Sequence, residues 1–166
     1  MRSIGFDLST VSTGWAVIED NLVLKDYGII DFTKKQPFRE KLLLFGSLIS
    51  QVIERQKPLD YLVFEDTFVL HNIATTKILN KFSGVAIYSA LKVLGQDPTK
   101  LSLLAPAAIR SAIFPKMKTN KEMVYSHICE KYSLVPDKKV TRDDIPDAIA
   151  AAMYPHLKPE NLKWIL

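Results

Sequence analysis

Three aspartates stand close together near the end of the chain, in the stretch TRDDIPDAIAAAM at positions 141–153. If Asp143 caps the helix that this stretch predicts, Asp144 is its first residue and Asp147 its fourth, and the two share one face. Interaction with the helix dipole is worth only ~0.3–1 kcal/mol per acid, which accounts for Asp143 but not for the pair. Pro146 is tolerated in a first turn. It leaves an alternative open, in which the turn is shifted and Asp143 and Asp144 exchange roles.

Two further acids occur where apolar strands are predicted. Asp7 lies in the run SIGFDL and Glu65 follows the apolar run LVF. A carboxylate at the end of a buried strand costs free energy unless it is paired, hydrogen-bonded or bound to a metal. Either acid alone is explained by a loop anchor or a helix cap, but two at the same end of adjacent strands indicate a site. Asp66 replaces Glu65 in this role if the strand register differs by one residue.

The acids Asp7, Glu65, Asp144 and Asp147 are therefore predicted to converge as catalytic and metal-binding residues. Carboxylate oxygens suit Mg²⁺ or Mn²⁺, and the sequence offers no Cys/His cluster for zinc. Two such ions about 4 Å apart activate a water and stabilise the leaving oxygen of a phosphodiester. Metal-assisted phosphodiester hydrolysis is the chemistry that this set of residues favours.

Positive charge is concentrated in one part of the chain. The net charge is +4, but the segment 110–142 alone holds eight Lys or Arg and three acids, a balance of +5. Such a segment suits a polyanion such as nucleic acid, although a solvated lysine-rich helix face has the same composition. If the first interpretation holds, binding is steeply salt-dependent, with phosphate contacts from Arg110, Lys116, Lys118 and Lys121.

The predicted elements make an α/β domain spanning residues 1–166. Strands are predicted at 3–8, 13–19, 22–32, 60–66 and 101–105. Helices are predicted at 37–56, 74–94, 106–114, from Thr119 or Asn120 to 132, and after Asp143. This order favours a five-stranded mixed sheet flanked by helices, with the first three strands antiparallel. No apolar run reaches the ~18 residues that span a bilayer, and the one cysteine, Cys129, fits a reducing compartment, so we expect a cytoplasmic protein.

These stretches resemble the RuvC family of Holliday junction resolvases, in the ribonuclease H-like superfamily. The resemblance covers nearly the whole chain and rests on five motifs: IGFDLSTVSTGWAVIE, VFEDTF, SGVAIYSAL, AAIRSAIF followed by TNKE, and DDIPDAIAAAM. Two departures stand out. The family commonly reads D-P-G where this chain has Asp7-Leu8-Ser9, and often has alanines in place of Ile145-Pro146. The chain resembles phage-encoded members more than cellular ones, which implies the cytoplasm of a host cell.

The resemblance implies a Mg²⁺-dependent endodeoxyribonuclease of DNA recombination and repair, a homodimer that nicks a four-way junction symmetrically. It implies two Mg²⁺ per active site, with Mn²⁺ as a substitute, held by the four acids. Phe68 matches an aromatic residue that stacks on an unpaired base, and Arg110 and Lys121 match basic residues near the scissile phosphate. The helix at 74–94 matches one that packs across the dimer two-fold. Its small residues would permit close approach: Ala74, Ser83, Gly84, Ala86 and Ala90.

Parts of the sequence are also typical of three other functions. A broader nuclease for branched DNA (forks and flaps) has the same residues. FDLSTVSTGWAVI also resembles the phosphate loop of actin-like ATPases and sugar kinases, but those proteins need two such domains and an adenosine site. A non-catalytic nucleic-acid-binding relative would not need four acids. The sequence leaves open the cleavage-sequence preference, the selectivity for junctions and the need for a branch-migration partner.

Overall fold

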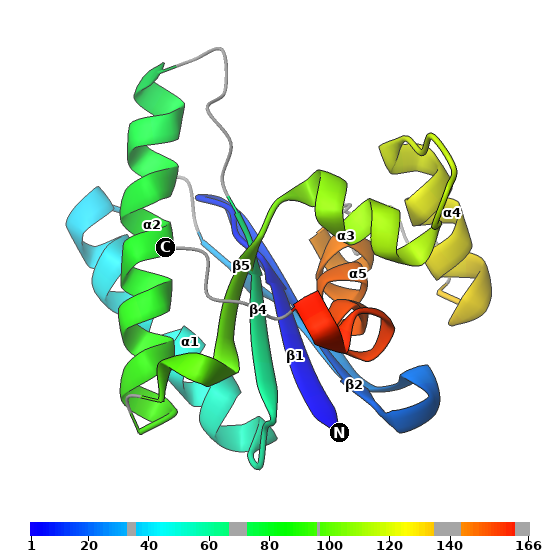
Figure 1. Ribbon diagram of the computed structural model, residues 1–166. Coiled ribbons are helices and arrows are strands. Elements are labelled where there is room, and N and C mark those ends of the chain that lie inside the picture. Colours follow the sequence, from blue (N-terminus) through cyan, green and yellow to red (C-terminus); the bar gives the residue numbers. More distant parts are fainter. Residues whose placement is uncertain (33–35, 67–72, 96, 135–143, 162–166) are drawn as a thin grey trace.

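The computed structural model describes residues 1–32, 36–66, 73–95, 97–134 and 144–161 (Figure 1). Its centre is a five-stranded sheet in the order β3-β2-β1-β4-β5. The strands are β1 (Arg2–Asp7), β2 (Ser12–Glu19), β3 (Val23–Asp31), β4 (Tyr61–Glu65) and β5 (Leu101–Leu104). β1, β2 and β3 pair antiparallel, whereas β4 runs parallel to β1 and to β5. The prediction of a mixed sheet with three antiparallel strands first is confirmed.

Helices cover both faces of the sheet (Figure 1). One face carries α1 (Phe38–Gln56) and α2 (Ile73–Val93), and the other carries α3 (Pro106–Ile113), α4 (Lys121–Lys131) and α5 (Asp144–Leu157). Short 3-10 turns lie at Asp20–Leu22, Pro98–Lys100 and Pro159–Asn161. Pro106 starts α3 in the position where its missing N–H costs nothing, and Asn120 caps α4 by accepting from the backbone N of Met123 at 2.9 Å. Among the described residues, no helix has the length and hydropathy that crossing a bilayer requires.

The two central strands are buried on both faces. Alternate residues of β1 and β4, such as Phe6 and Phe64, point into the core beneath α1 and α2, and their rings lie 5.3 Å apart. Val63 of β4 points the other way, into the core beneath α5. Central strands with apolar residues on both sides explain the continuous apolar runs in the sequence.

α5 lies unusually close to β1 and β2. A Cβ at Gly5 would overlap the backbone N of Ala152 and the carbonyl oxygen of Ala148. A Cβ at Gly14 would overlap the carbonyl oxygen of Asp144, at the first turn of α5. Glycine on the strands and alanine on the helix therefore let the two backbones approach, which fixes where α5 begins relative to β1.

Three of the five small residues of α2 pack inside the monomer. Ser83, Ala86 and Ala90 are 8%, 0% and 0% exposed, because this side of α2 faces the core and α1. The contact is close: a Cβ at Gly46 of α1 would lie 3.0 Å from the Ser89 hydroxyl oxygen. The prediction that Ser83, Ala86 and Ala90 form a dimer interface is therefore wrong. The other two residues of that prediction, Ala74 and Gly84, are exposed.

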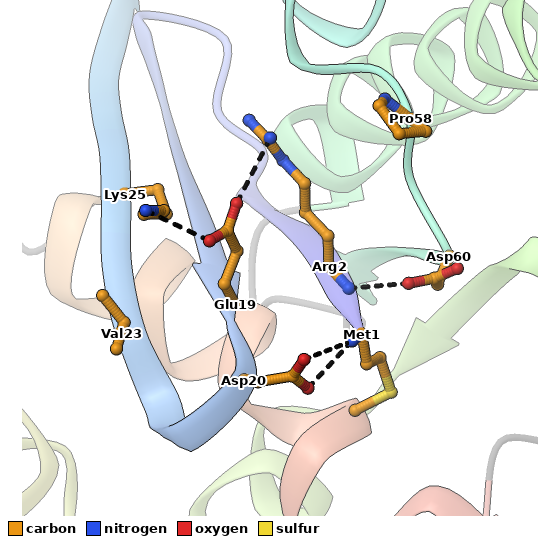
Figure 2. A pocket seen from close by; sticks show the side chains of 8 residues that line it. All are labelled: Met1, Arg2, Glu19, Asp20, Val23, Lys25, Pro58 and Asp60. Atoms are coloured by element: carbon orange, nitrogen blue, oxygen red, sulfur yellow. Dashed lines mark hydrogen bonds and ion pairs between the residues drawn. The ribbon is translucent and has the colours of Figure 1, made fainter.

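A network of charged groups closes the end of the sheet where β1 begins (Figure 2). The N-terminal amine donates to both carboxylate oxygens of Asp20 at 2.8 Å. Glu19 forms ion pairs with Arg2 at 3.3 Å and with Lys25 at 3.2 Å. These positive groups have acidic partners within the network, so we assign it a structural role in joining β1 to the β2–β3 turn.

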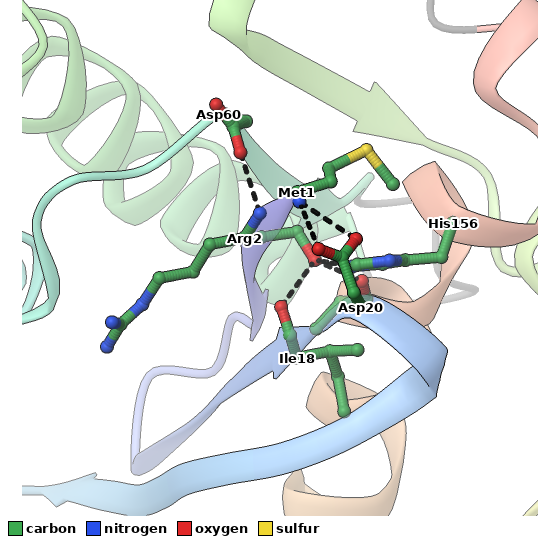
Figure 3. A network of polar contacts seen from close by, with 8 residues as sticks. Met1, Arg2, Ile18, Asp20, Asp60 and His156 are labelled. Carbon is green, nitrogen blue, oxygen red and sulfur yellow. Dashed lines mark hydrogen bonds and ion pairs between the residues drawn. The ribbon is translucent and has the colours of Figure 1, made fainter.

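The same end of the sheet also anchors the last turn of α5 (Figure 3). The buried Ser3 hydroxyl donates to the carbonyl oxygen of Ala152 at 2.6 Å and lies 2.9 Å from His156 Nε2. Burial lowers the pKa of His156, which favours its neutral form. β1 is therefore tied to α5 by a buried hydroxyl at the end of the sheet remote from Asp7.

Candidate functional site

Two of the predicted acids end neighbouring parallel strands. β1 and β4 pair with Phe6 opposite Phe64, and Asp7 and Glu65 are the next and last residues of these strands. Parallel strands carry such residues to the same edge of the sheet, as the sequence predicted. Asp66, the alternative to Glu65, is exposed, and its backbone N donates to the carbonyl oxygen of Leu104 at 2.8 Å. Glu65 is therefore the acid that belongs to the site.

α5 supplies the other two acids. Its first residue is Asp144, and Asp147 follows one turn later on the same face. Gly14, which contacts the Asp144 backbone, pairs directly with Asp7 across β1 and β2, so the start of α5 lies beside Asp7. The Ser12 hydroxyl, from the first residue of β2, donates to Asp144 Oδ2. Of the two alternatives left open by Pro146, the structure places Asp144 at the site, whereas Asp143 lies outside the described residues.

The four carboxylates interact electrostatically. Burial raises the pKa of Asp7 to about 8, with further contributions from the negative charges of Glu65, Asp147 and Asp144. Burial also raises the pKa of Glu65 to about 7, with Asp147 adding to the effect and Lys121 and Arg110 opposing it. The cluster holds more negative charge than its surroundings compensate, so a cation bound there would relieve the repulsion.

Two of the predicted basic residues lie beside the acids. Lys121, the first residue of α4, forms an ion pair with Asp147 at 2.9 Å, and the Asp147 side chain is only 15% exposed. Arg110 of α3 lines a small pocket together with Lys121, Glu65 and Asp147. Lys116 and Lys118 lie exposed between α3 and α4, and their contact with phosphates stays a prediction. Phe68 lies outside the described residues.

The donor set fits a hard divalent cation. It consists of carboxylate oxygens, the ligands that Mg²⁺ and Mn²⁺ prefer, and burial together with the neighbouring acids raises the pKa of Asp7 and Glu65. Within the described ranges, however, no three His, Cys, Asp or Glu side chains are close enough to form a complete metal site. The Lys121 ammonium pairs with one carboxylate oxygen of Asp147, Oδ2. A metal that used this oxygen would have to displace Lys121.

The order of the strands and the positions of the four acids define the class of protein. A mixed sheet whose first three strands are antiparallel, with acids at the ends of its two central strands and two more from the last helix, is a ribonuclease H-like fold with its acidic site. The chain belongs to the RuvC family: residues 3–155 match the sequence profile described as "Crossover junction endodeoxyribonuclease RuvC".

Individual relatives agree with this assignment. The chain is 30% identical over 155 residues to the RuvC of Orientia tsutsugamushi (strain Boryong), covering 92% of each chain. It is 27% identical over 156 residues to the RuvC of Chloroflexus aurantiacus (strain J-10-fl), covering 92% of this chain and 91% of that one. Both proteins bear the name crossover junction endodeoxyribonuclease.

Solved structures confirm the fold. Thermus thermophilus RuvC in complex with a Holliday junction substrate superposes with a TM-score of 0.77 at 16% identity, over 96% of this chain and 95% of that one. The yeast mitochondrial Holliday junction resolvase Ydc2 superposes with a TM-score of 0.62 at 12% identity, over 95% of this chain and 79% of that one.

Two features of the site could not be found in the sequence. Ser12 belongs to a run of small polar residues after Asp7, and nothing in the sequence distinguishes it from its neighbours Ser9, Thr10 and Thr13. The pairing of Lys121 with Asp147 joins residues 26 positions apart, in two helices whose relative placement follows only from the fold. The basic segment indicated that Lys121 is a candidate binding residue, but it did not indicate that Lys121 pairs with Asp147.

Proposed function

We propose that this protein is a structure-selective DNA endonuclease that resolves four-way junctions by paired, metal-dependent hydrolysis of phosphodiesters. The observation that carries the proposal is the convergence of four acids on one edge of the sheet, where burial and the other three acids raise the pKa of Asp7 to about 8. Membership in the RuvC family supports it, as does the likeness of the fold to a RuvC that was solved with a Holliday junction substrate.

In this proposal Asp7, Glu65, Asp144 and Asp147 hold Mg²⁺, with Mn²⁺ as a substitute and two ions per site. When bound, such ions activate a water and stabilise the leaving oxygen of a phosphodiester. Arg110 and Lys121 bind the phosphate at the mouth of the site. Lys121 has a second role in the absence of metal, since its pairing with Asp147 compensates part of the repulsion among the acids.

The test is incubation of the protein with a synthetic four-way junction, a flap and a linear duplex, each with Mg²⁺ or Mn²⁺. Paired symmetric nicks in the junction alone are the expected result. Comparable cutting of the flap and the junction would favour the broader branched-DNA nuclease instead. Absence of cutting in all three substrates with either metal would overturn both forms of the proposal.

A matched pair of variants tests the assignment of the acids. Glu65→Gln removes a metal ligand, so cleavage of the junction should fall by at least ~100-fold, as expected for lost metal catalysis. Junction binding in a gel-shift assay should be retained or tighter, because a negative charge is removed near the DNA. Asp66→Asn changes the neighbouring exposed acid and should leave cleavage intact. Equal effects of the two substitutions would contradict the placement of Glu65.

We also propose a homodimer that uses the outward side of α2. Tyr88 is 70% exposed on α2, and a Cβ added at Gly84, one turn earlier, would meet nothing within 4 Å. An aromatic ring beside an open backbone is a surface against which a second copy can pack closely. Tyr88→Glu should convert the dimer to monomer in light scattering and replace paired nicks by single nicks. Tyr27→Glu, at an exposed tyrosine of β3, is the matched control and should leave the dimer intact.

Phage origin, a location in the host cytoplasm and the need for a branch-migration partner stay predictions. The same holds for the actin-like ATP-binding alternative, which a melting shift with ATP but none with junction DNA would favour.

A further inference from the structure

Ser12 is the residue that links the β1–β2 turn to the acidic end of α5. It is only 3% exposed, and its hydroxyl donates to Asp144 Oδ2. We propose that Ser12 is a positioning residue for metal binding: it holds the Asp144 carboxylate so that the other oxygen remains available to a divalent cation. This inference rests on the proposed metal-dependent function of the site.

The turn that carries Ser12 is fixed by its own hydrogen bonds. The backbone N of Ser9 donates to Thr13 Oγ1 at 3.1 Å, and the same Thr13 hydroxyl lies 3.2 Å from the Ser9 carbonyl oxygen. Beyond the turn, the backbone N of Phe32 donates to the Val11 carbonyl oxygen at 2.9 Å. Thr13 is completely buried. Ser12 therefore projects from a rigid turn, which is the condition under which one hydroxyl can fix the orientation of a carboxylate.

The backbone of Asp144 is held from the same strand. Its carbonyl group lies against Gly14, two residues after Ser12, where a Cβ would overlap it. β2 thus contacts both the main chain and the side chain of Asp144. With the backbone fixed, the hydrogen bond from Ser12 selects the side-chain rotamer.

The two acids of α5 are held by donors of different charge. Asp147 pairs with the Lys121 ammonium, which competes with a metal for the same carboxylate. Asp144 accepts from a neutral hydroxyl, which orients the carboxylate without supplying the positive charge that a metal would bring. Asp144 is therefore arranged before the metal arrives, whereas Asp147 is paired with a group of the same charge as the metal. Loss of the Ser12 hydroxyl should weaken metal binding without removing a ligand.

The test measures Mn²⁺ binding to the whole protein without DNA, by the EPR signal of free Mn²⁺. Ser12→Ala should weaken the Mn²⁺ affinity by roughly 10–100-fold, the range typical for loss of a group that orients a metal ligand. Ser12→Cys keeps a side chain of similar size with a poor donor and should show the same loss, so it decides the matter if Ser12→Ala does not fold.

Ser3→Ala is the matched control. It removes another buried hydroxyl that joins the sheet to α5, but at the carbonyl of Ala152, away from the acids. It should lower the melting temperature in EDTA and leave the Mn²⁺ affinity unchanged. A loss of affinity in Ser3→Ala as large as in Ser12→Ala would show that Ser12 acts only through general docking of α5, and would overturn the proposal.

Cleavage gives a second readout. In Ser12→Ala the Mn²⁺ concentration for half-maximal junction cleavage should rise by the same factor as the Mn²⁺ dissociation constant. The cleavage rate at saturating Mn²⁺ should stay within about threefold of the wild-type rate. An unchanged Mn²⁺ affinity in both Ser12 variants would refute the positioning role. Failure of the proposed function is a different result, since the wild-type protein would then bind Mn²⁺ and cut no junction.

Discussion

Asp7 shows how a functional residue can cost the protein stability. Its pKa is raised to about 8 by burial and by the neighbouring acids, so the folded protein binds more protons than the unfolded chain between about pH 4 and pH 8. Unfolding then releases protons in this window, and stability falls as the pH rises through it. The same reasoning applies to Glu65, whose pKa is raised to about 7.

This linkage predicts the pH dependence of the metal-free protein. A pKa of about 8 at Asp7 corresponds to roughly 4 kcal/mol of stability lost over the three pH units above pH 5. In EDTA, we therefore expect the melting temperature to fall between about pH 5 and pH 8.5 by roughly 8–16 °C. Asp7→Asn should remove most of the fall and raise the melting temperature at the upper pH, and added Mg²⁺ should do the same for the wild-type protein.

Asp97→Asn is the control for this prediction. The Thr99 hydrogen bonds lower the pKa of that carboxyl, so its contribution to stability is lost only in acid, below the tested window. It should leave the slope between about pH 5 and pH 8.5 unchanged. A wild-type melting temperature that rises across this window would contradict the raised pKa values of the cluster.

Individual site residues differed in how well the sequence predicted them. Asp7, Glu65, Asp144 and Asp147 were identifiable because a charged residue in an apolar context is costly and therefore needs a reason. Ser12 was not, because serine is common in turns and its hydroxyl contributes only after the turn has placed it against Asp144. The role of Ser83, Ala86 and Ala90 was predicted wrongly, since small residues permit close helix packing within one chain as well as between two.

At the scale of elements, the docking of α5 on β1 sets the geometry of the site. A Cβ at Gly5 or Gly14 would overlap the backbone of Ala152 or Asp144, so only glycine allows the strands and the helix to lie this close together. The bounds of the helices and strands follow closely from sequence patterns, because Pro, Gly and Asn mark their ends. The distance between α5 and the sheet does not, since it depends on which glycine meets which alanine.

A substitution at Gly5 tests this close approach. Gly5→Ala should destabilise the protein by about 1–3 kcal/mol, the range for overpacking a core, and should reduce cleavage because α5 carries two of the acids. Leu43→Ala, at a position of α1 that is 78% exposed, should instead change the free energy of unfolding by less than about 0.5 kcal/mol. Denaturant unfolding measures both. A neutral Gly5→Ala would show that α5 can move without cost.

At the scale of the whole molecule, charge separates along the chain. The segment 110–142 carries a balance of +5, whereas the remainder sums to −1. Two cations of this segment, Arg110 and Lys121, lie beside Glu65 and Asp147 at the acidic edge of the sheet. Charge in the sequence predicted the class of partner, but only the fold shows that these cations stand beside the acids instead of on a remote helix face.

Lys116 and Lys118 belong to the same basic segment and lie exposed between α3 and α4, which predicts the salt dependence of junction binding. A double logarithmic plot of affinity against salt should lose about 0.9 in slope for each phosphate contact removed, hence about 2 for Lys116→Gln with Lys118→Gln. The matched control removes two charges from the other end of the sheet, with Lys25→Gln and Lys57→Gln, and should keep the slope. Equal reductions of the slope in both double variants would mean that net charge alone governs binding, and not the surface that carries Lys116 and Lys118.

The docking of the last long helix on the first strand also determines when activity can appear during synthesis. Asp7 and Gly5 are translated before the last two acids of the cluster and the alanines that cover Gly5, which belong to residues 144–152. A nascent chain therefore exposes one side of β1 until these residues have been made, and until then it lacks two of the four carboxylates of the cluster.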